Sequence, residues 1–354
     1  MNVLVTGGAG FIGSHLCEIL LARGCCVSVM DDLSTGRYSN IEHLEKNGNF
    51  ELIIDTILNK SLIEALVKSA DIIFHLASAV GVRLILEQPV KTIETIVEGT
   101  TTVLSQARRY RRKVVLTSTS EVYGKGSKVP FSEQDDTILG PTTTRRWAYA
   151  AAKTIDEFLS LAHWYETRLP VTCARLFNTV GPRQTGQYGM VIPRFVDQAL
   201  QGKDIVVYGD GEQTRSFCHV RDVAAALVNL SSCPEALGKV VNIGNNQEVT
   251  INKLAARVKE LSGSSSNIVH IPYELAYEEG FEDMKRRVPD LTLARELIDF
   301  RAKYSLDDIL LDVIQEQSKK LDQLKAKEDA RMAQPEHQSL LRAAGGRAGN
   351  PRAS

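Results

Sequence analysis

The stretch Val3-Leu4-Val5-Thr6-Gly7-Gly8-Ala9-Gly10-Phe11-Ile12-Gly13 predicts how the first half of the chain folds. The apolar residues 3–5 indicate a buried parallel strand, and a helical pattern follows at residues 15–21. Glycines at 7, 10 and 13 would allow a tight turn, the approach of a pyrophosphate to the backbone, and close packing of helix on strand. We therefore expect a dinucleotide site here. A glycine-rich turn without a ligand is the alternative.

The bulk composition is that of an ordinary globular protein. The 354 residues carry a formal net charge of −1, with 43% hydrophobic and 24% charged residues. This balance does not favour nucleic acid as a partner, and no apolar run is long enough to cross a membrane. A strand that begins at Val3 leaves no room for a signal peptide. The six cysteines lack metal-binding spacing, so we expect reduced thiols, no metal site and a cytoplasmic protein.

Apolar runs alternate with helical patterns through the first half of the chain. Such alternation predicts an α/β fold with a Rossmann doubly wound parallel sheet. Ligands of these sheets bind beyond the carboxyl ends of the strands, where the hydroxyl-rich residues 117–120 fall. The expected strands are 27–30, 50–54, 71–77 and 113–116, and the expected helices are 60–68, 88–109 and 148–168.

An acidic residue at the end of the second expected strand bears on the choice of cofactor. Asp31 lies 18 residues beyond Gly13, about where a carboxylate accepts hydrogen bonds from an adenosine ribose. A carboxylate at this place would repel a 2′-phosphate, so NAD is expected rather than NADP. An aspartate that caps a helix or a turn is the alternative.

A tyrosine and a lysine lie four residues apart on the expected helix 148–168. Tyr149 and Lys153 would share one face of that helix. An ammonium group near a phenol lowers the pKa of the phenol and prepares it as a general base. The spacing alone is common. After a glycine-rich loop and a Ser/Thr-rich strand end, it indicates a catalytic pair.

The second half of the chain departs from simple alternation. Short strands and helices after residue 183 predict a smaller α/β cap over the binding edge of the sheet, and residues 309–329 predict a charged terminal helix. The expected division is a NAD-binding domain at 1–178 with contributions from about 215–245, a cap mostly at 179–315, and a terminal helix with a disordered tail at 316–354.

Several motifs together resemble the extended short-chain dehydrogenases/reductases that modify nucleotide sugars, over about residues 1–315. The resemblance implies tightly bound NAD, a UDP- or dTDP-sugar under the cap, and a homodimer joined by a four-helix bundle of helices 88–109 and 148–168. The motifs are the glycine-rich loop, His75-Leu76-Ala77, Ser118-Thr119-Ser120-Glu121-Val122-Tyr123-Gly124, Tyr149-x-x-x-Lys153, Phe177-Asn178-x-x-Gly181-Pro182-Arg183 and Val207-Tyr208-Gly209-Asp210-Gly211.

The resemblance also implies roles for single residues. Thr119 is the catalytic hydroxyl, Tyr149 the base at the sugar 4-hydroxyl, and Lys153 the ligand of the nicotinamide ribose. The family's Gly-Asp-Ile segment after the third strand is replaced by Asp55-Thr56-Ile57, and a common asparagine is absent near Ile96, so the adenine contacts differ. Expected cofactor contacts are Gly7, Gly10, Phe11, Ile12, Gly13, Asp31, Thr56, Ile57, Leu76, Ala77, Tyr149 and Lys153. Expected substrate contacts are Asn178, Arg194, Tyr208, Arg215 and Arg287.

The residues around Glu121 bear on which reaction the chain catalyses. Sugar nucleotide 4,6-dehydratases carry an Asp-Glu pair where this chain has Ser120-Glu121, so the resemblance disfavours a dehydratase. UDP-glucuronate decarboxylases carry the run found at 118–124, and Arg146-Trp147-x-Tyr149 resembles a bacterial decarboxylase domain. Arg287 resembles an arginine that faces the sugar carboxylate or the diphosphate.

The implied reaction is NAD-dependent decarboxylation of UDP-glucuronate to UDP-xylose through a 4-keto intermediate. Ser120 and Arg287 would orient the carboxylate, and Glu121 would assist ring distortion or proton delivery. A UDP-glucuronate or UDP-glucose 4-epimerase with the same Thr119, Tyr149 and Lys153 is the alternative. A non-catalytic NAD-binding regulator is a third interpretation, which the intact catalytic set disfavours.

Overall fold

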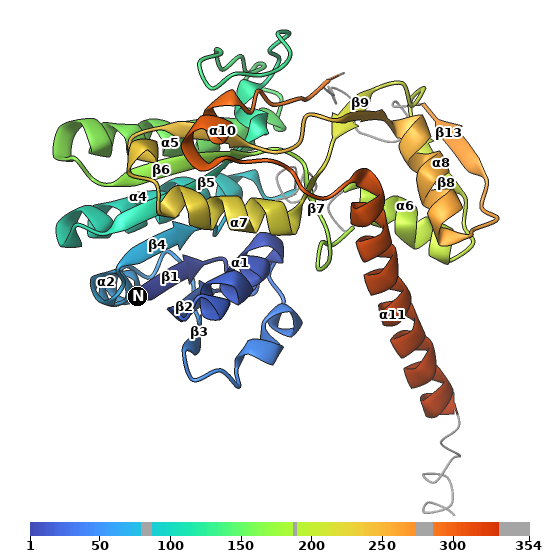
Figure 1. Cartoon of the computed structure of the whole chain (residues 1–354), viewed down its shortest axis with the longest axis horizontal. Coiled ribbons are helices and arrows are strands. Elements are labelled where there is room, and N and C mark those ends of the chain that lie inside the picture. Colours follow the sequence, from blue (N-terminus) through green and yellow to red (C-terminus); the bar gives the residue numbers. More distant parts are fainter. Residues whose placement is uncertain (79–86, 187–189, 273–285, 333–354) are drawn as a thin grey trace, which may run out of the picture.

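The computed structural model describes residues 1–78, 87–186, 190–272 and 286–332 (Figure 1). Its centre is a seven-stranded sheet in the order β11-β6-β5-β4-β1-β2-β3, and every neighbouring pair in it is parallel. The expected doubly wound α/β sheet is confirmed. Its strands are β1 Asn2–Thr6, β2 Cys26–Asp31, β3 Phe50–Ile54, β4 Ile72–His75, β5 Lys113–Thr119, β6 Val171–Leu176 and β11 Val240–Ile243.

Helices cover both faces of this sheet, which is why its strands are apolar without alternation. Along β1, Val3 and Val5 join the core on one face, while Leu4 joins the core on the other. The first core is closed by α1 Phe11–Ala22, α7 Val220–Ser231 and α10 Thr292–Ile298, and the second by α2 Lys60–Ser69, α4 Pro89–Tyr110 and α5 Trp147–Thr167.

A smaller unit with its own apolar core lies beyond the carboxyl ends of the strands (Figure 1). In it, β8 Ile205–Tyr208 pairs with β13 Ile268–Ile271, and β9 Thr214–Ser216 pairs with β12 Glu248–Thr250. The short strands β7 Thr179–Val180 and β10 Cys218–His219 pair where the chain crosses between the two units. Its helices are α6 Val191–Leu200, α8 Ile251–Ser262 and the start of α11 Leu306–Met332.

Two regions add to the sequence-based expectation. Helix α10 was not predicted, and it packs on α7 and β11, so it belongs with the large sheet and not with the cap. The predicted terminal helix is present but longer, and the predicted disordered tail at 333–354 lies outside the described residues. None of the described helices is long and apolar enough to span a bilayer.

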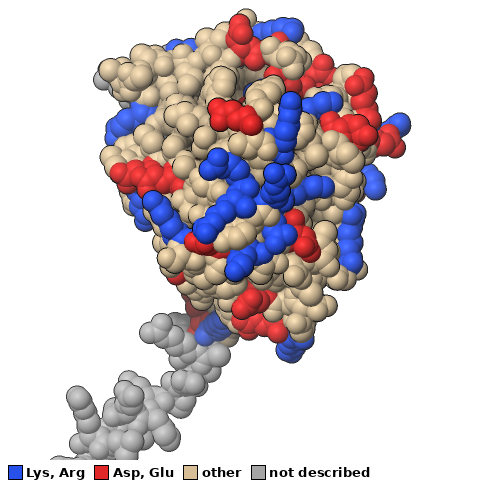
Figure 2. All heavy atoms as spheres, turned by 90° about the vertical axis from the view of Figure 1, so that its left-hand side faces the viewer, with Lys and Arg blue, Asp and Glu red and all other residues tan. Residues whose placement is uncertain are grey.

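Arginines gather where α4 and α5 end. Figure 2 shows lysine and arginine side chains concentrated on that face, and Arg108, Arg109 and Arg168 line a hollow there. Cations at this place complement the carbonyl ends of the two helices.

One buried ion pair ties α5 to the sheet. Arg175 on β6 donates to both carboxylate oxygens of Glu157 on α5, with Nη2 to Oε2 at 2.7 Å and Nε to Oε1 at 2.9 Å. The Ser118 hydroxyl on β5 donates to the same carboxylate. Both charged side chains are less than a tenth exposed. Helix α5 is therefore fixed on β5 and β6 by charge as well as by apolar contact.

We expect Arg175→Met to lower the free energy of unfolding by about 3–5 kcal/mol, because Glu157 would remain as a buried charge without its partner. Urea denaturation followed by circular dichroism measures this change. Arg301→Met is the control, because Arg301 pairs with Asp299 at the surface and its loss should cost less than about 1 kcal/mol. Equal effects of the two substitutions would contradict the role given to the buried pair.

Candidate active site

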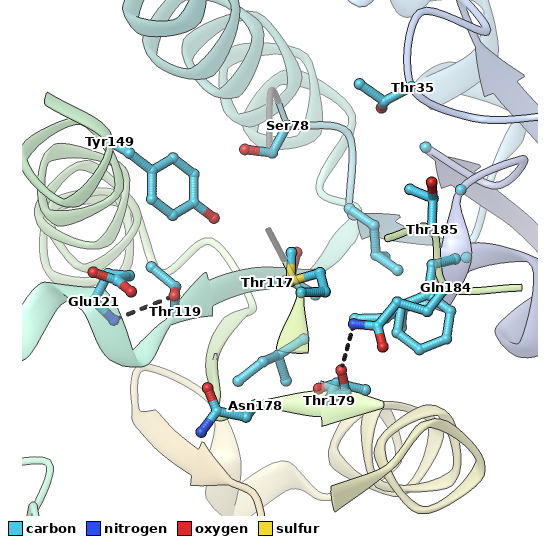
Figure 3. A pocket seen from close by; sticks show the side chains of 18 of the residues that line it. Thr35, Ser78, Thr117, Thr119, Glu121, Tyr149, Asn178, Thr179, Gln184 and Thr185 are labelled. Carbon is cyan, nitrogen blue, oxygen red and sulfur yellow. Dashed lines mark hydrogen bonds between the residues drawn. The ribbon is translucent and has the colours of Figure 1, made fainter. Parts of the chain in front are cut away.

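A cavity of about 670 Å³ opens at the carboxyl ends of the sheet strands, between the sheet and the cap. Residues that follow β1, β4, β5 and β6 line one side of it, and residues of α6, β8 and β9 line the other. Parallel strands present their carboxyl ends at one edge, so chain segments far apart in sequence meet there. Figure 3 shows side chains from several of these segments around the open space.

The glycine-rich loop forms one end of this cavity. Gly7 has φ +74, and a Cβ on Gly13 would come within 2.2 Å of the carbonyl oxygen of Gly7. Gly10 caps α1 without a side chain that accepts from the first turn. The N-terminal N–H groups of α1 therefore remain available to phosphate oxygens.

Asp31 lines the cavity next to this loop. Its Oδ2 accepts from the Ala9 N–H and its Oδ1 from the Leu33 N–H, both at 2.9 Å. Burial raises the pKa of Asp31, and the two backbone hydrogen bonds oppose that rise. Each oxygen keeps lone pairs for further donors such as ribose hydroxyls.

Most of the predicted cofactor contacts line the cavity, and two do not. Thr56 is absent from the lining, where its neighbour Asp55 lies, and its contact with the cofactor stays a prediction. Lys153 is buried behind the lining, with a relative exposure of 2%. The predicted contacts that do line it are Gly7, Gly10, Phe11, Ile12, Gly13, Asp31, Ile57, Leu76, Ala77 and Tyr149.

Tyr149 projects from α5 into the cavity, with its hydroxyl toward the side where Thr119 and Ser78 lie (Figure 3). Burial raises the pKa of the Tyr149 phenol, and the charge of Glu121 adds to the rise. The hydroxyls of Ser78 and Thr119 offset part of it. The prediction that this pKa is lowered is therefore wrong for the ligand-free chain.

The pKa of Tyr149 is raised partly because of the residue that pairs with Lys153. Lys153 Nζ donates to Asp156 Oδ2 at 2.8 Å, one turn further along α5. The negative charge of Asp156 also raises the pKa of Tyr149. The cation that was expected to favour the phenolate is thus accompanied by a carboxylate.

A cluster of three charges lies beside Tyr149. Glu121 Oε1 is 2.6 Å from Arg287 Nη2, and its Oε2 is 3.5 Å from Arg146 Nη2. Burial acts to raise the pKa of Glu121, but Arg287 and Arg146 hold it below its usual value. Glu121, Arg146 and Arg287 all line the cavity, as does Ser120. We refer to the three charged residues as the Glu121 cluster.

The predicted substrate residues also line the cavity, and one of them, Arg287, belongs to the Glu121 cluster. Asn178 donates from Nδ2 to the Ser216 carbonyl at 3.0 Å, and the Arg194 guanidinium lies 4.0 Å from the centre of the Tyr208 ring. Arg215 comes from β9 and also lines the cavity. Two guanidinium groups that line one cavity suit a diphosphate, because each can bind phosphate oxygens with two donors.

Three residues near the catalytic pair were missed as site residues. Arg146 precedes Tyr149 by three positions, so helical spacing could have placed it on the same face. Ser78 follows the His75-Leu76-Ala77 motif at the end of β4. Asp156 follows Lys153 by three positions, but nothing in the sequence separates it from an exposed helix residue.

Comparison with known proteins agrees with this geometry. The family described as GDP-mannose 4,6 dehydratase matches residues 4–313. A UDP-N-acetyl-alpha-D-glucosaminuronate decarboxylase of Bacillus cytotoxicus is 44% identical over 313 residues, which cover 88% of this chain and 96% of that protein. UDP-glucuronic acid decarboxylase 1 of Xenopus tropicalis is 37% identical over 321 residues, 91% of this chain and 73% of that protein.

Solved structures show the same likeness. The UDP-glucuronic acid 4-epimerase of Bacillus cereus, in complex with UDP-glucuronic acid and NAD, superposes with a TM-score of 0.81 at 28% identity, over 90% of this chain and 99% of that one. The fold, the cavity and the matched residues all lead to one assignment. This chain belongs to the extended short-chain dehydrogenase/reductase family of nucleotide-sugar epimerases, dehydratases and decarboxylases.

Proposed function

We propose that this chain is an NAD-dependent decarboxylase of UDP-glucuronate that forms UDP-xylose. The observation that carries the proposal is the Glu121 cluster, which puts two guanidinium groups and one carboxylate beside Tyr149 in the wall of the cavity. The names of the decarboxylase relatives support it. A neutral hexose would give the cluster no carboxylate to bind.

The residues present fit NAD. The uncapped start of α1 suits the pyrophosphate, Asp31 suits the adenosine ribose, and Lys153 lies behind Tyr149 with two N–H donors beyond the one given to Asp156. The structural neighbour from Bacillus cereus contains NAD. When bound, NAD would accept the hydrogen and electron pair of sugar C4 and return them in the last step.

Tyr149 moves the proton at the sugar 4-hydroxyl. As a phenolate it takes that proton while C4 becomes a ketone, and Thr119 steadies the same oxygen. The C6 carboxylate is then β to the ketone, so its C5–C6 bond breaks with release of carbon dioxide and the electron pair moves into an enolate. A proton joins C5, and Tyr149 returns its proton to O4 when the ketone is reduced.

The Glu121 cluster suits a carboxylate that must leave. Two guanidinium groups without a counter-charge would bind the substrate carboxylate most strongly before reaction, which raises the barrier to its loss. Glu121 reduces the net charge of the cluster to +1. The cluster can therefore place the carboxylate without holding it too tightly.

A second substrate is favoured by a specific observation. The Bacillus cytotoxicus relative, at 44% identity, is named for UDP-N-acetylglucosaminuronate, which differs at the sugar C2 substituent. The chemistry at C4, C5 and C6 would be the same. A 4-epimerase of UDP-glucuronate is the remaining candidate, since the Bacillus cereus neighbour has this name.

One assay separates these candidates. Purified protein is mixed with UDP-glucuronate, or in parallel with its 2-acetamido analogue, without added NAD, and the products are weighed by mass spectrometry. We expect the loss of one carbon dioxide from UDP-glucuronate. An unchanged mass with a new chromatographic peak would establish the epimerase, and reaction of the acetamido sugar alone would establish the second substrate.

Tyr149→Phe should lower the decarboxylation rate by about 10²–10⁴-fold, because the variant has no group that can take the 4-hydroxyl proton. The NAD content of the purified variant, measured by mass spectrometry after denaturation, should equal that of the wild type. Retained activity would remove Tyr149 from its role as base. Loss of NAD would show that the substitution acts on binding and not on proton transfer.

Glu121→Gln should lower both kcat and KM, each by about tenfold, because the two arginines would then bind the substrate carboxylate without an opposing charge. Steady-state kinetics with UDP-glucuronate measures both constants. Glu64→Gln is the matched control, since Glu64 pairs with Arg109 at the surface and should leave both constants unchanged. A wild-type kcat in Glu121→Gln would exclude this role for Glu121.

We also propose a homodimer, which the exposed face of α4 and α5 supports. Val90, Ile93, Ile155, Phe158 and Tyr165 are apolar side chains between 40% and 71% exposed on these two helices. Such a patch on two adjacent helices suits a second copy of the same face.

We also place the protein in the cytoplasm, because all six cysteines are free thiols.

Phe158→Glu should convert the dimer to a monomer, because a charge at the centre of an apolar interface cannot be desolvated without cost. Sedimentation velocity measures the change in mass. Leu324→Glu, on the exposed part of α11, is the control and should leave the dimer intact. A wild-type protein that sediments as a monomer would contradict the proposed bundle.

A further inference from the structure

A buried carboxylate lies beside the catalytic lysine and has no part in the reaction derived above. Asp156 and Lys153 form an ion pair at 2.8 Å, and their side chains are 0% and 3% exposed. Tyr149, Lys153 and Asp156 follow one another on α5 at spacings of four and three residues, so they lie on one helix face. The pair sits directly behind the base.

Burial of the Asp156 carboxylate has a large desolvation cost. Among the described residues, its Oδ1 has no hydrogen-bond partner, and the groups that favour its ionised form are mainly the Lys153 ammonium and the Thr100 hydroxyl. Burial raises the pKa of Asp156, and Lys153 opposes the rise. A buried ion pair is weak as a source of stability. We therefore look for a role of this carboxylate other than a contribution to stability.

This role concerns the effect of the Lys153 and Asp156 charges on the Tyr149 phenol. An ammonium group near a phenol favours the phenolate, and a carboxylate at the same place disfavours it. Asp156 contributes to the raised pKa of Tyr149, together with burial and Glu121. Asp156 therefore offsets part of the effect that the Lys153 ammonium has on the Tyr149 phenol.

We propose that Asp156 is a positioning residue for the catalytic pair: its carboxylate holds the Lys153 ammonium and offsets its charge, which keeps Tyr149 protonated until the site is loaded. The proposal rests on the proposed function for the role of Tyr149 as base. Lys153 keeps two N–H donors for a ribose while it holds Asp156. The arrangement delays formation of the phenolate in the empty site.

Other charged groups around the pair are fixed by their own partners. His75 on β4 is fully buried, and burial together with Lys153 lowers its pKa to about 3, so it stays neutral. Burial raises the pKa of Cys173 on β6 to about 12, so its thiol stays protonated. Among the residues that the structure describes, the other charged groups near the pair are Glu157, which pairs with Arg175, and Glu121, which pairs with Arg287 and Arg146.

The test is the ionisation of Tyr149 in the NAD-loaded protein without substrate. Tyrosine labelled with ¹³C at Cζ reports its charge by NMR, and Tyr149→Phe assigns the signal. Tyr149 and Asp156 are seven residues apart on a helix, about 10 Å. At an effective dielectric constant of about 20, removing one negative charge at this distance lowers a pKa by about one unit. Asp156→Asn should therefore move the midpoint about one pH unit lower.

The pH profile of decarboxylation gives a second readout. Tyr149 must be ionised to act, so the acid limb of kcat/KM in Asp156→Asn should move to lower pH by the same amount. If the wild type decarboxylates no UDP-hexuronate, the proposed function fails, but the NMR midpoint still decides the role of Asp156. The two failures are therefore distinguishable.

Controls separate charge from shape. Asp156→Glu keeps the charge and should keep the wild-type midpoint, whereas Asp156→Gln has the same shape as that variant and should shift like Asp156→Asn. Asp299→Asn removes a surface carboxylate and should shift nothing. An unchanged midpoint in the neutral variants would overturn the proposal. It would equally be overturned if neither neutral variant yields a folded, NAD-binding protein, because the carboxylate would then be structural.

Discussion

The bidentate contact between Arg175 and Glu157 determines where the reaction can take place. Glu157 is one residue beyond Asp156 and four beyond Lys153, so the contact that fixes α5 on β6 also fixes the position of Tyr149 and Lys153 relative to the sheet. Ser118 adds a contact from β5, one residue before Thr119. The buried contact of Arg175, Glu157 and Ser118 thus holds both α5, which carries Tyr149, and β5, which carries Thr119. We refer to this contact as the anchor.

Charges around this anchor are arranged in pairs. Lys153 is paired with Asp156, Arg175 with Glu157, and Arg287 with Glu121, while Arg146 adds one further cation. Paired buried charges hold a defined geometry even when they add little stability. The cavity is therefore organised before any ligand arrives, and a substrate carboxylate meets a small net positive charge.

Most of the fold could be predicted from the sequence because the strands of a covered parallel sheet are apolar runs. The residues that line the site were largely predictable too, since Gly7, Thr119, Tyr149 and Asn178 belong to motifs with fixed spacing. Helix α10 was missed, because its seven residues depend on packing against α7 and β11. Asp156 was missed because its importance depends on its burial, and Arg146 was missed because its partner Glu121 lies on another element.

The raised pKa of Tyr149 shows why local sequence is not enough. The Tyr-x-x-x-Lys spacing predicts a phenol that is acidified by its neighbour, and that argument considers two residues only. In the folded chain, the phenol is also desolvated and faces the charges of Glu121 and Asp156, so its pKa rises. Glu121 and Asp156 are each paired with a cationic side chain. A change in either ion pair when ligands bind would therefore change the pKa of Tyr149. The pKa of Tyr149 thus depends on burial and on the carboxylates around it, neither of which the Tyr-x-x-x-Lys motif contains.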